Sequence, residues 1–91
     1  MRDYPKSVKE AVKRLLLELP ENDKLVIKNT PEEDLSLFHF TWANYVRNEF
    51  GLWDNNDELL KDCLPDSNER NPDDASAVII TALWKSLQAS V

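Results

Sequence analysis

The fold of this chain is decided by residues 71–87, which read NPDDASAVIITALWKSL. Asn71 is typical of a helix N-cap, and Pro72 is typical of the first helical turn. The acidic pair Asp73-Asp74 complements the positive end of the helix dipole. Apolar residues then cover more than half of the helical wheel: Ala75, Val78, Ile79, Ile80, Ala82, Leu83, Trp84 and Leu87. This pattern predicts a helix in the middle of a helical bundle.

A first helix and a short second one are predicted before residue 30. Ser7 and Glu10 have the spacing of a capping box, in which each side chain accepts a hydrogen bond from the other residue's amide. The apolar face that follows ends before Pro20 and consists of Val8, Ala11, Val12, Leu15, Leu16 and Leu19. The short apolar run within residues 21–29 suits either a strand or a helical turn. We favour a short helix, because no partner strand is visible.

Residues 31–50 are predicted to form one long helix. Thr30 is its N-cap, Pro31 takes the first helical position, and Gly51 is a left-handed residue that ends it. Steps of 100° per residue place one apolar stripe along this helix: Leu35, Phe38, Trp42, Tyr45, Val46 and Phe50. Leu37 and Phe40 lie off the stripe, so they either contact another helix or form an exposed surface for a partner.

The remaining elements complete an all-α fold. Asn56 is expected to cap a short helix that ends before Pro65, and residues 66–71 are expected to form a polar surface loop. We therefore predict a single helical domain over residues 1–91, a bundle of four principal helices plus one short helix. The last helix is central in this bundle.

The overall charge restricts the kinds of partner. The chain has seventeen acidic and eleven basic side chains, which give a net charge of -6. This argues against nucleic acid and against an anionic membrane surface, and it favours a basic protein as the partner. The apolar runs are only a few residues long, far short of the ~20 that a membrane-spanning helix needs. One glycine, Gly51, is too few for the glycine-rich loops of nucleotide-binding folds.

The negative charge is unevenly distributed along the chain. Residues 1–30 hold seven basic and five acidic side chains, whereas residues 31–91 hold four and twelve. The segment from Asp54 to Asp74 alone has eight acids against Lys61 and Arg70. The sequence therefore predicts a dipolar surface, with the 54–74 region as the place where a partner binds.

Cysteine and histidine give little support to catalysis or metal binding. The single Cys63 cannot form an intrachain disulfide, and the chain begins without a signal-peptide pattern, so a cytoplasmic location is expected. We expect Cys63 to be a small, half-buried hydrophobe rather than a nucleophile paired with His39. One Cys and one His are too few for a zinc site, and the Asp54–Glu58 cluster has Leu59 where a calcium loop needs glycine. We predict no cofactor and no metal.

The segment from Arg47 to Trp53 ends the predicted long helix. Arg47 and Asn48 suit the last turn, where a cation and an amide can interact with free carbonyl groups. Gly51 then reverses the chain, and the Leu52-Trp53 pair is expected to be buried. One hypothesis is that Arg47 pairs with Asp73 or Asp74, which would hold the start of the last helix against the end of the long one.

The chain resembles an uncharacterised family of small bacterial helical proteins, a domain of unknown function. The resemblance covers roughly residues 4 to 88 and rests on His39-Phe40, Tyr45–Asn48, Gly51–Trp53 and Pro72–Ser76. This chain departs from the family pattern at Thr41, Ala43 and Asn71. The resemblance implies a shared helical fold in which the Arg-Asn-x-x-Gly-Leu-Trp and Pro-Asp-Asp-x-Ser elements belong together. It implies no catalytic residue.

Three classes of function compete. The leading hypothesis is a non-enzymatic protein-binding module of the antitoxin, immunity or adaptor type, with an acidic surface for a basic partner. The alternative is an enzyme or small-ligand binder with a cleft formed by Arg47, Asn48, Trp53, Asp73 and Asp74. The third is a homo-oligomer that associates through Leu37 and Phe40. Each hypothesis predicts a different exposed or concave surface.

Overall fold

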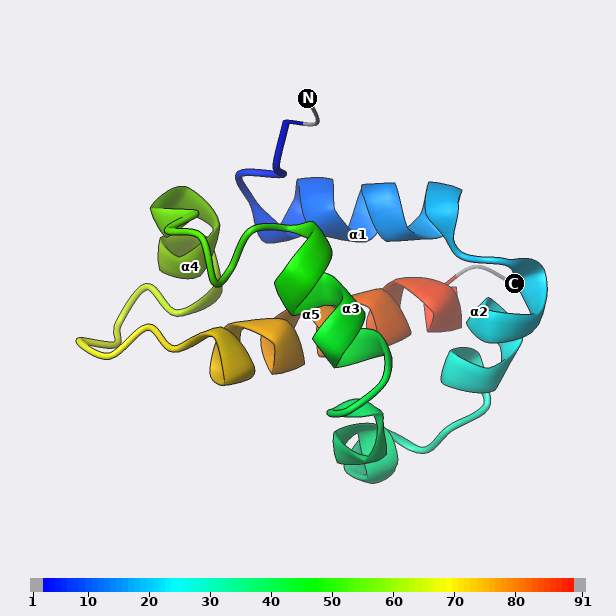
Figure 1. Ribbon diagram of the computed structural model, residues 1–91. Helices are drawn as coiled ribbons and strands as arrows, with labels where there is room; N and C mark the ends of the chain where they lie inside the picture. The colour runs from blue at the N-terminus through cyan, green and yellow to red at the C-terminus, as the bar shows by residue number, and fades with distance from the viewer. Residues whose placement is uncertain (1–2, 90–91) are drawn as a thin grey trace.

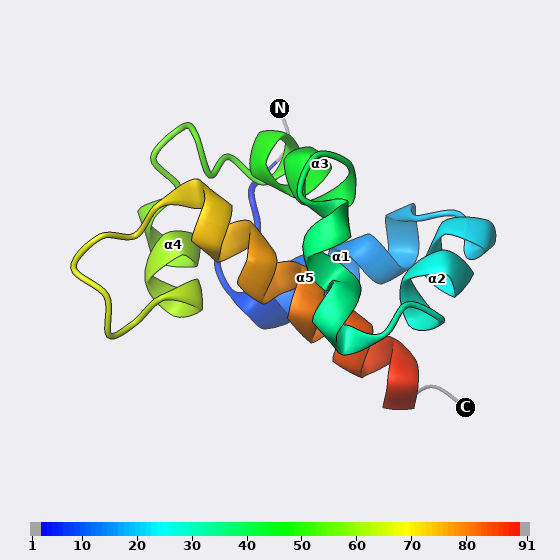
Figure 2. The ribbon, with the colours of Figure 1, turned by 90° about the horizontal axis from the view of Figure 1, so that it is seen from below.

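Helix α5 (Pro72–Ala89) runs through the middle of the molecule (Figures 1 and 2). It contacts each of the other helical elements in the computed structural model, which describes residues 3–89. In chain order these elements are α1 (Val8–Glu18), α2 (Glu21–Lys28), the 3₁₀ helix η1 (Glu32–Phe38), α3 (Trp42–Glu49) and α4 (Asp57–Cys63). Residues 3–89 contain no strand, so the all-α prediction is confirmed, and the short second helix lies where it was expected.

One hydrophobic core surrounds α5. The helix contributes the fully buried Ala75, Ile79 and Leu83. Each neighbouring element adds at least one deeply buried side chain to the same cluster: Leu15, Ile27, Phe38, Val46 and Leu59. The radius of gyration of 12.3 Å matches the ~12 Å of a compact domain of this length. No helix within residues 3–89 is both long enough and apolar enough to cross a membrane.

The start of α1 is held by two acids. The Glu10 amide donates to Ser7 Oγ at 3.1 Å, as the capping box predicts. The Glu10 carboxylate, however, accepts from the Lys6 amide at 3.0 Å rather than from Ser7. A second acceptor comes from α4, where Asp62 Oδ2 lies 2.7 Å from the Val8 amide. The free amides at this helix end are therefore satisfied partly by a residue 54 positions away.

The predicted long helix over residues 31–50 is wrong, because the segment is broken at residues 39–41. Before the break lies η1, and after it lies α3, with Thr41 in a non-helical conformation (φ -116°, ψ -101°). The His39 carbonyl, which an uninterrupted helix would use internally, accepts a hydrogen bond from Arg47 Nη2 at 2.8 Å. The Phe38 and Trp42 rings pack edge to face across the break, with centroids 4.7 Å apart.

The apolar stripe still faces the core in spite of the break. Leu35 and Phe38 are buried from η1, and Val46 and Phe50 are buried from α3 and its C-terminal end. Trp42 and Tyr45 are partly buried against the same cluster. Two short elements thus place these side chains on α5 from two directions, which one straight helix cannot do.

The predicted N-cap at Thr30 is also wrong. The Thr30 hydroxyl donates to the Val26 carbonyl at 2.7 Å, and Pro31 occupies the N-cap position of η1. The Thr30 carbonyl accepts a 2.7 Å hydrogen bond from Trp84 Nε1 on α5. The link between α2 and η1 is therefore fixed by a contact with the central helix.

Gly51 ends α3 as the sequence predicts. Its φ is +70°, and the Leu52 amide donates to the Arg47 carbonyl at 3.2 Å, which is the Schellman arrangement. Leu52 is buried, but the prediction for Trp53 is wrong because its side chain is 57% exposed. The turn continues through hydrogen bonds from the amides of Asp54 and residue 56 to the Gly51 carbonyl, and Trp53 lies within that exposed turn.

Two asparagines precede helices but have different roles. Asn71 caps α5, because its Oδ1 accepts from the Asp74 amide at 2.8 Å. Asn56 precedes α4 but makes no side-chain cap, contrary to expectation. Its buried Nδ2 instead donates to the carbonyls of Pro5 and Phe50 at 2.9 and 2.8 Å. Asn56 thereby attaches the N-terminal segment to the end of α3.

Candidate functional site

Arg47 joins three parts of the molecule at the N-terminal end of α5. The residue is 4% exposed and reaches from α3 to the first turn of α5. Its Nη1 donates to Ser76 Oγ at 2.9 Å, and its Nη2 donates to the His39 carbonyl at 2.8 Å. Ser76 Oγ in turn donates to the Asp73 carbonyl at 2.9 Å. The guanidinium therefore holds the turn between η1 and α3 against the central helix.

Arg47 pairs with one of the two acids predicted as its partner. Arg47 Nε lies 3.5 Å from Asp73 Oδ1, which is an ion pair. The same Nε is buried without a hydrogen bond, so the contact is an electrostatic attraction at a distance longer than an ordinary hydrogen bond. Asp74 is not the partner, since its carboxylate accepts from Asn71 Nδ2 at 3.0 Å. Of the two acids, Asp73 thus provides the pairing.

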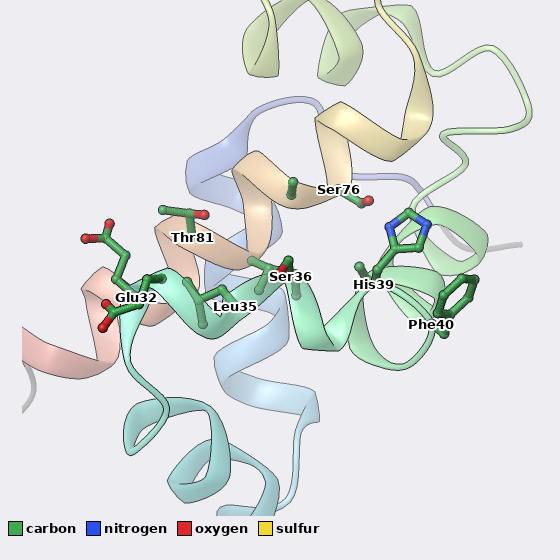
Figure 3. A pocket seen from close by; sticks show the side chains of 11 residues that line it. Glu32, Leu35, Ser36, His39, Phe40, Ser76 and Thr81 are labelled. Atoms are coloured by element: carbon green, nitrogen blue, oxygen red, sulfur yellow. The ribbon is translucent and has the colours of Figure 1, made fainter.

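A groove of about 540 Å³ lies beside this junction, between η1 and α5 (Figure 3). Its interior is mainly apolar, with Leu35, Ala43 and Ile80 among the lining residues, and hydroxyl groups come from Ser36 and Thr81. The other lining residues are Glu32, Glu33, His39, Phe40, Ser76 and Ala77.

The two ends of the groove differ in chemistry. Glu32 lies at one end, near Thr81, while His39 and Phe40 lie at the other (Figure 3). The carboxylates of Glu32 and Glu33 are exposed and make no hydrogen bond or ion pair with any residue in the described range 3–89. The His39 and Phe40 rings meet edge to face with centroids 4.8 Å apart. A bound group would therefore meet free negative charge at one end and aromatic surface at the other.

Arg47 fixes the aromatic end of the groove from behind. It does not line the groove, but both residues that receive its hydrogen bonds, His39 and Ser76, do. These residues come from different elements, the turn before α3 and the first turns of α5. The buried guanidinium therefore sets the separation of the two walls.

Comparison with known proteins identifies the family. A family model described as a domain of unknown function (DUF6794) matches residues 4–87. The chain belongs to this family. No curated protein and no solved structure matches it. The match includes α1 to α4, η1 and α5 as far as residue 87, and it confirms the resemblance to an uncharacterised family.

The structure places the predicted site residues in separate environments. Arg47 and Asp73 are in contact, whereas Asp74 belongs to the cap of α5. Asn48 and Trp53 are exposed, the former on α3 and the latter in the turn after it. These five residues were predicted to surround one cleft, but the groove described above is lined by other residues.

The predicted surface formed by Leu37 and Phe40 is closer to the groove than the predicted cleft. Phe40 lines it and is 85% exposed, and Leu37, on η1, is 72% exposed. Glu32 and Glu33 were not among the site residues predicted from the sequence. The available signal was the combination of three consecutive acids, residues 32–34, with two bulky apolar residues off the core stripe.

Cys63 has the properties of a core residue. Burial, with a smaller contribution from the negative charge of Asp62, raises the pKa of the Cys63 thiol to about 12. The thiol is therefore neutral near pH 7 and a poor nucleophile. Within the described range, no three His, Cys, Asp or Glu side chains are grouped as a metal site requires.

Proposed function

We propose that this chain is a non-enzymatic protein-binding module whose groove between η1 and α5 holds a basic, partly apolar segment of another protein. The observation that carries the proposal is the pair Glu32 and Glu33, which lies at the end of an apolar groove without an internal partner. A Lys or Arg side chain at this end would complement the charge, while the apolar part of the segment would fill the groove.

The distribution of charge supports a basic partner at this groove. In the 54–74 region, where sequence reasoning expected the partner, five of the eight acids already interact within the chain: Asp54, Glu58, Asp62, Asp73 and Asp74. The acids of residues 32–34 make no such contact within the described chain. Free carboxylates attract an incoming cation more strongly than carboxylates that are already paired.

Exposed apolar side chains support a protein as the bound species. Phe40, in the turn after η1, and Leu37, on η1, expose most of their surface. Aromatic residues near the centre of an interface often supply much of the binding free energy. An apolar interior with an aromatic edge and a charged end resembles the composition of a protein interface, with an apolar centre and a polar rim.

The alternative of a ligand cleft or active site at Arg47, Asn48, Trp53, Asp73 and Asp74 has less support. Both Nη atoms of Arg47 donate within the chain, and Ser76 Oγ, its nearest hydroxyl, also donates to a backbone carbonyl. A binding module of the antitoxin, immunity or adaptor type, acting in the cytoplasm, fits the small size and the acidic groove better. Self-association through Leu37 and Phe40 is the third proposal.

Affinity capture with matched variants tests the proposed function. Tagged protein would be crosslinked in cells of the source organism, and captured proteins would be identified by mass spectrometry at low and moderate salt. We expect the wild type and a control, Asp66→Asn with Glu69→Gln, to capture the same basic protein. The groove variant, Glu32→Gln with Glu33→Gln, is expected to lose it, and the wild type is expected to release it as salt rises.

Both variants remove two negative charges from exposed positions, so they separate the groove from net charge. Equal capture by the two variants would contradict the proposal. Capture of a second copy of this chain, confirmed by solution mass, would favour the homo-oligomer instead.

A further inference from the structure

The groove continues along the outer surface of α5. A second hollow of about 370 Å³ shares Ala77 and Thr81 with it and is also lined by Val78, Ala82 and Lys85. Ala77, Thr81 and Lys85, which are four residues apart on one face of α5, form a row along the two hollows, a rise of roughly 12 Å at 1.5 Å per residue. We call this combined feature the α5 trough. Its length corresponds to two to three turns of a helix.

We propose that the α5 trough binds an amphipathic helix of the partner protein, which packs lengthwise along α5. This inference rests on the proposed function and specifies the conformation and sequence pattern of the bound segment. Helix-in-groove binding uses apolar anchors at positions i, i+3 or i+4, and i+7 on one face. Such a set extends about 10 Å along the helix, which fits within the trough.

The side chains that line the trough on α5 permit close approach of a second helix. Ala77 is exposed, and Thr81 and Ala82 are partly exposed, so the surface at these positions is formed by small groups. Helices pack with axes 8–10 Å apart, and small residues at the contact allow the shorter separations. An extended peptide would leave its own amides and carbonyls facing these side chains, whereas a helix satisfies them internally.

The charges around the trough define the pattern of the partner helix. Glu32 and Glu33 lie on the η1 side, so basic residues are expected on the flank of the partner helix that faces η1. Lys85 lies one turn beyond Thr81 on α5 and disfavours a basic residue over that position. Phe40, at the other end of the groove, offers a surface for an apolar anchor.

Peptide selection tests this inference and does not require the partner to be identified first. Phage-displayed random 16-residue peptides would be selected on the full chain and sequenced. We expect enriched sequences with apolar residues at i, i+3 or i+4 and i+7 and with Lys or Arg on one adjoining flank. Synthetic versions are expected to gain helical circular dichroism on binding, and Ala77→Arg in the chain is expected to weaken them at least about tenfold.

Ala89→Arg is the matched control, because it adds the same side chain at an exposed position of the same helix outside the trough. We expect it to change the affinity less than about twofold. Enriched peptides without helical periodicity, equal effects of the two variants, or no enrichment over an unrelated acidic protein would each overturn the helix inference. The proposed function would survive these results if the affinity capture remained dependent on Glu32 and Glu33.

Discussion

Two acidic stretches of this chain use their carboxylates in different ways. In the 54–74 region, carboxylates hold other parts of the molecule: Asp54 accepts from the Tyr4 hydroxyl, Asp62 from the Val8 amide, and Asp73 pairs with Arg47. The acids of residues 32–34 have no such partners within the described chain, and Glu32 and Glu33 line an apolar groove. Most carboxylates of the first stretch make contacts within the folded chain, whereas those of the second stretch have no partner within the described residues.

This difference shows why charge density along a sequence is a poor guide to an interface. The 54–74 region contains more acids, yet most of them neutralise or orient groups of the same chain. A carboxylate that already accepts a hydrogen bond at 2.7 Å has less to gain from an external cation than a solvated one. Four predictions test the contrast, in order of their expected effect on the free energy of unfolding.

Arg47→Met is expected to have the largest effect, a loss of about 3 kcal/mol in the free energy of unfolding. Met retains much of the apolar stem but removes both donated hydrogen bonds. The His39 carbonyl and Ser76 Oγ at the buried junction then lose these donors. Urea unfolding followed by Trp fluorescence measures the loss. Asp73→Asn is the companion variant and is expected to cost less than about 1 kcal/mol, because the Asp73 side chain is 55% exposed. Unchanged stability of Arg47→Met would contradict the role of this junction.

Gly51→Ala is expected to lower stability by about 2 kcal/mol. Gly51 has φ +70°, and an added Cβ would overlap the ring of Tyr4, whose hydroxyl donates to Asp54. The same substitution in a Tyr4→Ala background is expected to cost about half as much, because the overlap is then absent and the backbone strain remains. Equal costs in the two backgrounds would show that the Tyr4 ring moves away freely.

Asp62→Ala is expected to lower stability by about 1 kcal/mol, the usual cost of losing a helix cap. Its carboxylate accepts from the first amide of α1, so the loss should be concentrated there. Hydrogen exchange at the Val8 amide would show the local effect, and thermal unfolding would show the global one. Asp66→Ala is the control, since Asp66 is an exposed acid of the same stretch, and it should leave both measurements nearly unchanged.

Glu32→Gln with Glu33→Gln is expected to have the smallest effect, within about 0.5 kcal/mol of the wild type. These carboxylates are exposed and have no partner within the described chain, so we expect their removal to cost little in folding and to abolish the proposed partner capture. The urea titration used for Arg47→Met provides the comparison. A loss of stability as large as that of Asp62→Ala would mean that both acidic stretches serve the fold.

Much of the fold could be predicted from local sequence signals. The Asn71 cap, the Ser7 cap, the left-handed Gly51 and the apolar wheel of α5 all appear in the structure. Each depends on residues within one or two helical turns, where side-chain and backbone chemistry largely decide the conformation. The family resemblance carried by the Arg47 and Asp73 segments is likewise visible in the sequence.

The break at residues 39–41 had no comparable local signal. No glycine or proline marks it, and the periodicity of the apolar stripe continues across it. It is stabilised by Arg47, which takes the His39 carbonyl, and by the need for Phe38 and Val46 to reach α5 from different directions. The error at Asn56 has the same origin, because its Nδ2 donates to the distant Pro5 carbonyl. The error at Thr30 is a local one, since its hydroxyl donates to the Val26 carbonyl four residues earlier, and Trp53 lies in an exposed turn.

The sequence by itself determined the helical class, most helix ends and the central place of α5, because these follow from caps, turn residues and apolar periodicity over short stretches. The tertiary structure alone decided which charges are paired, where the long helical segment breaks, and that η1 and α5 enclose a groove. Those features depend on groups far apart in the chain, such as Val8 with Asp62 and Arg47 with Ser76, whose meeting is a result of packing around the core.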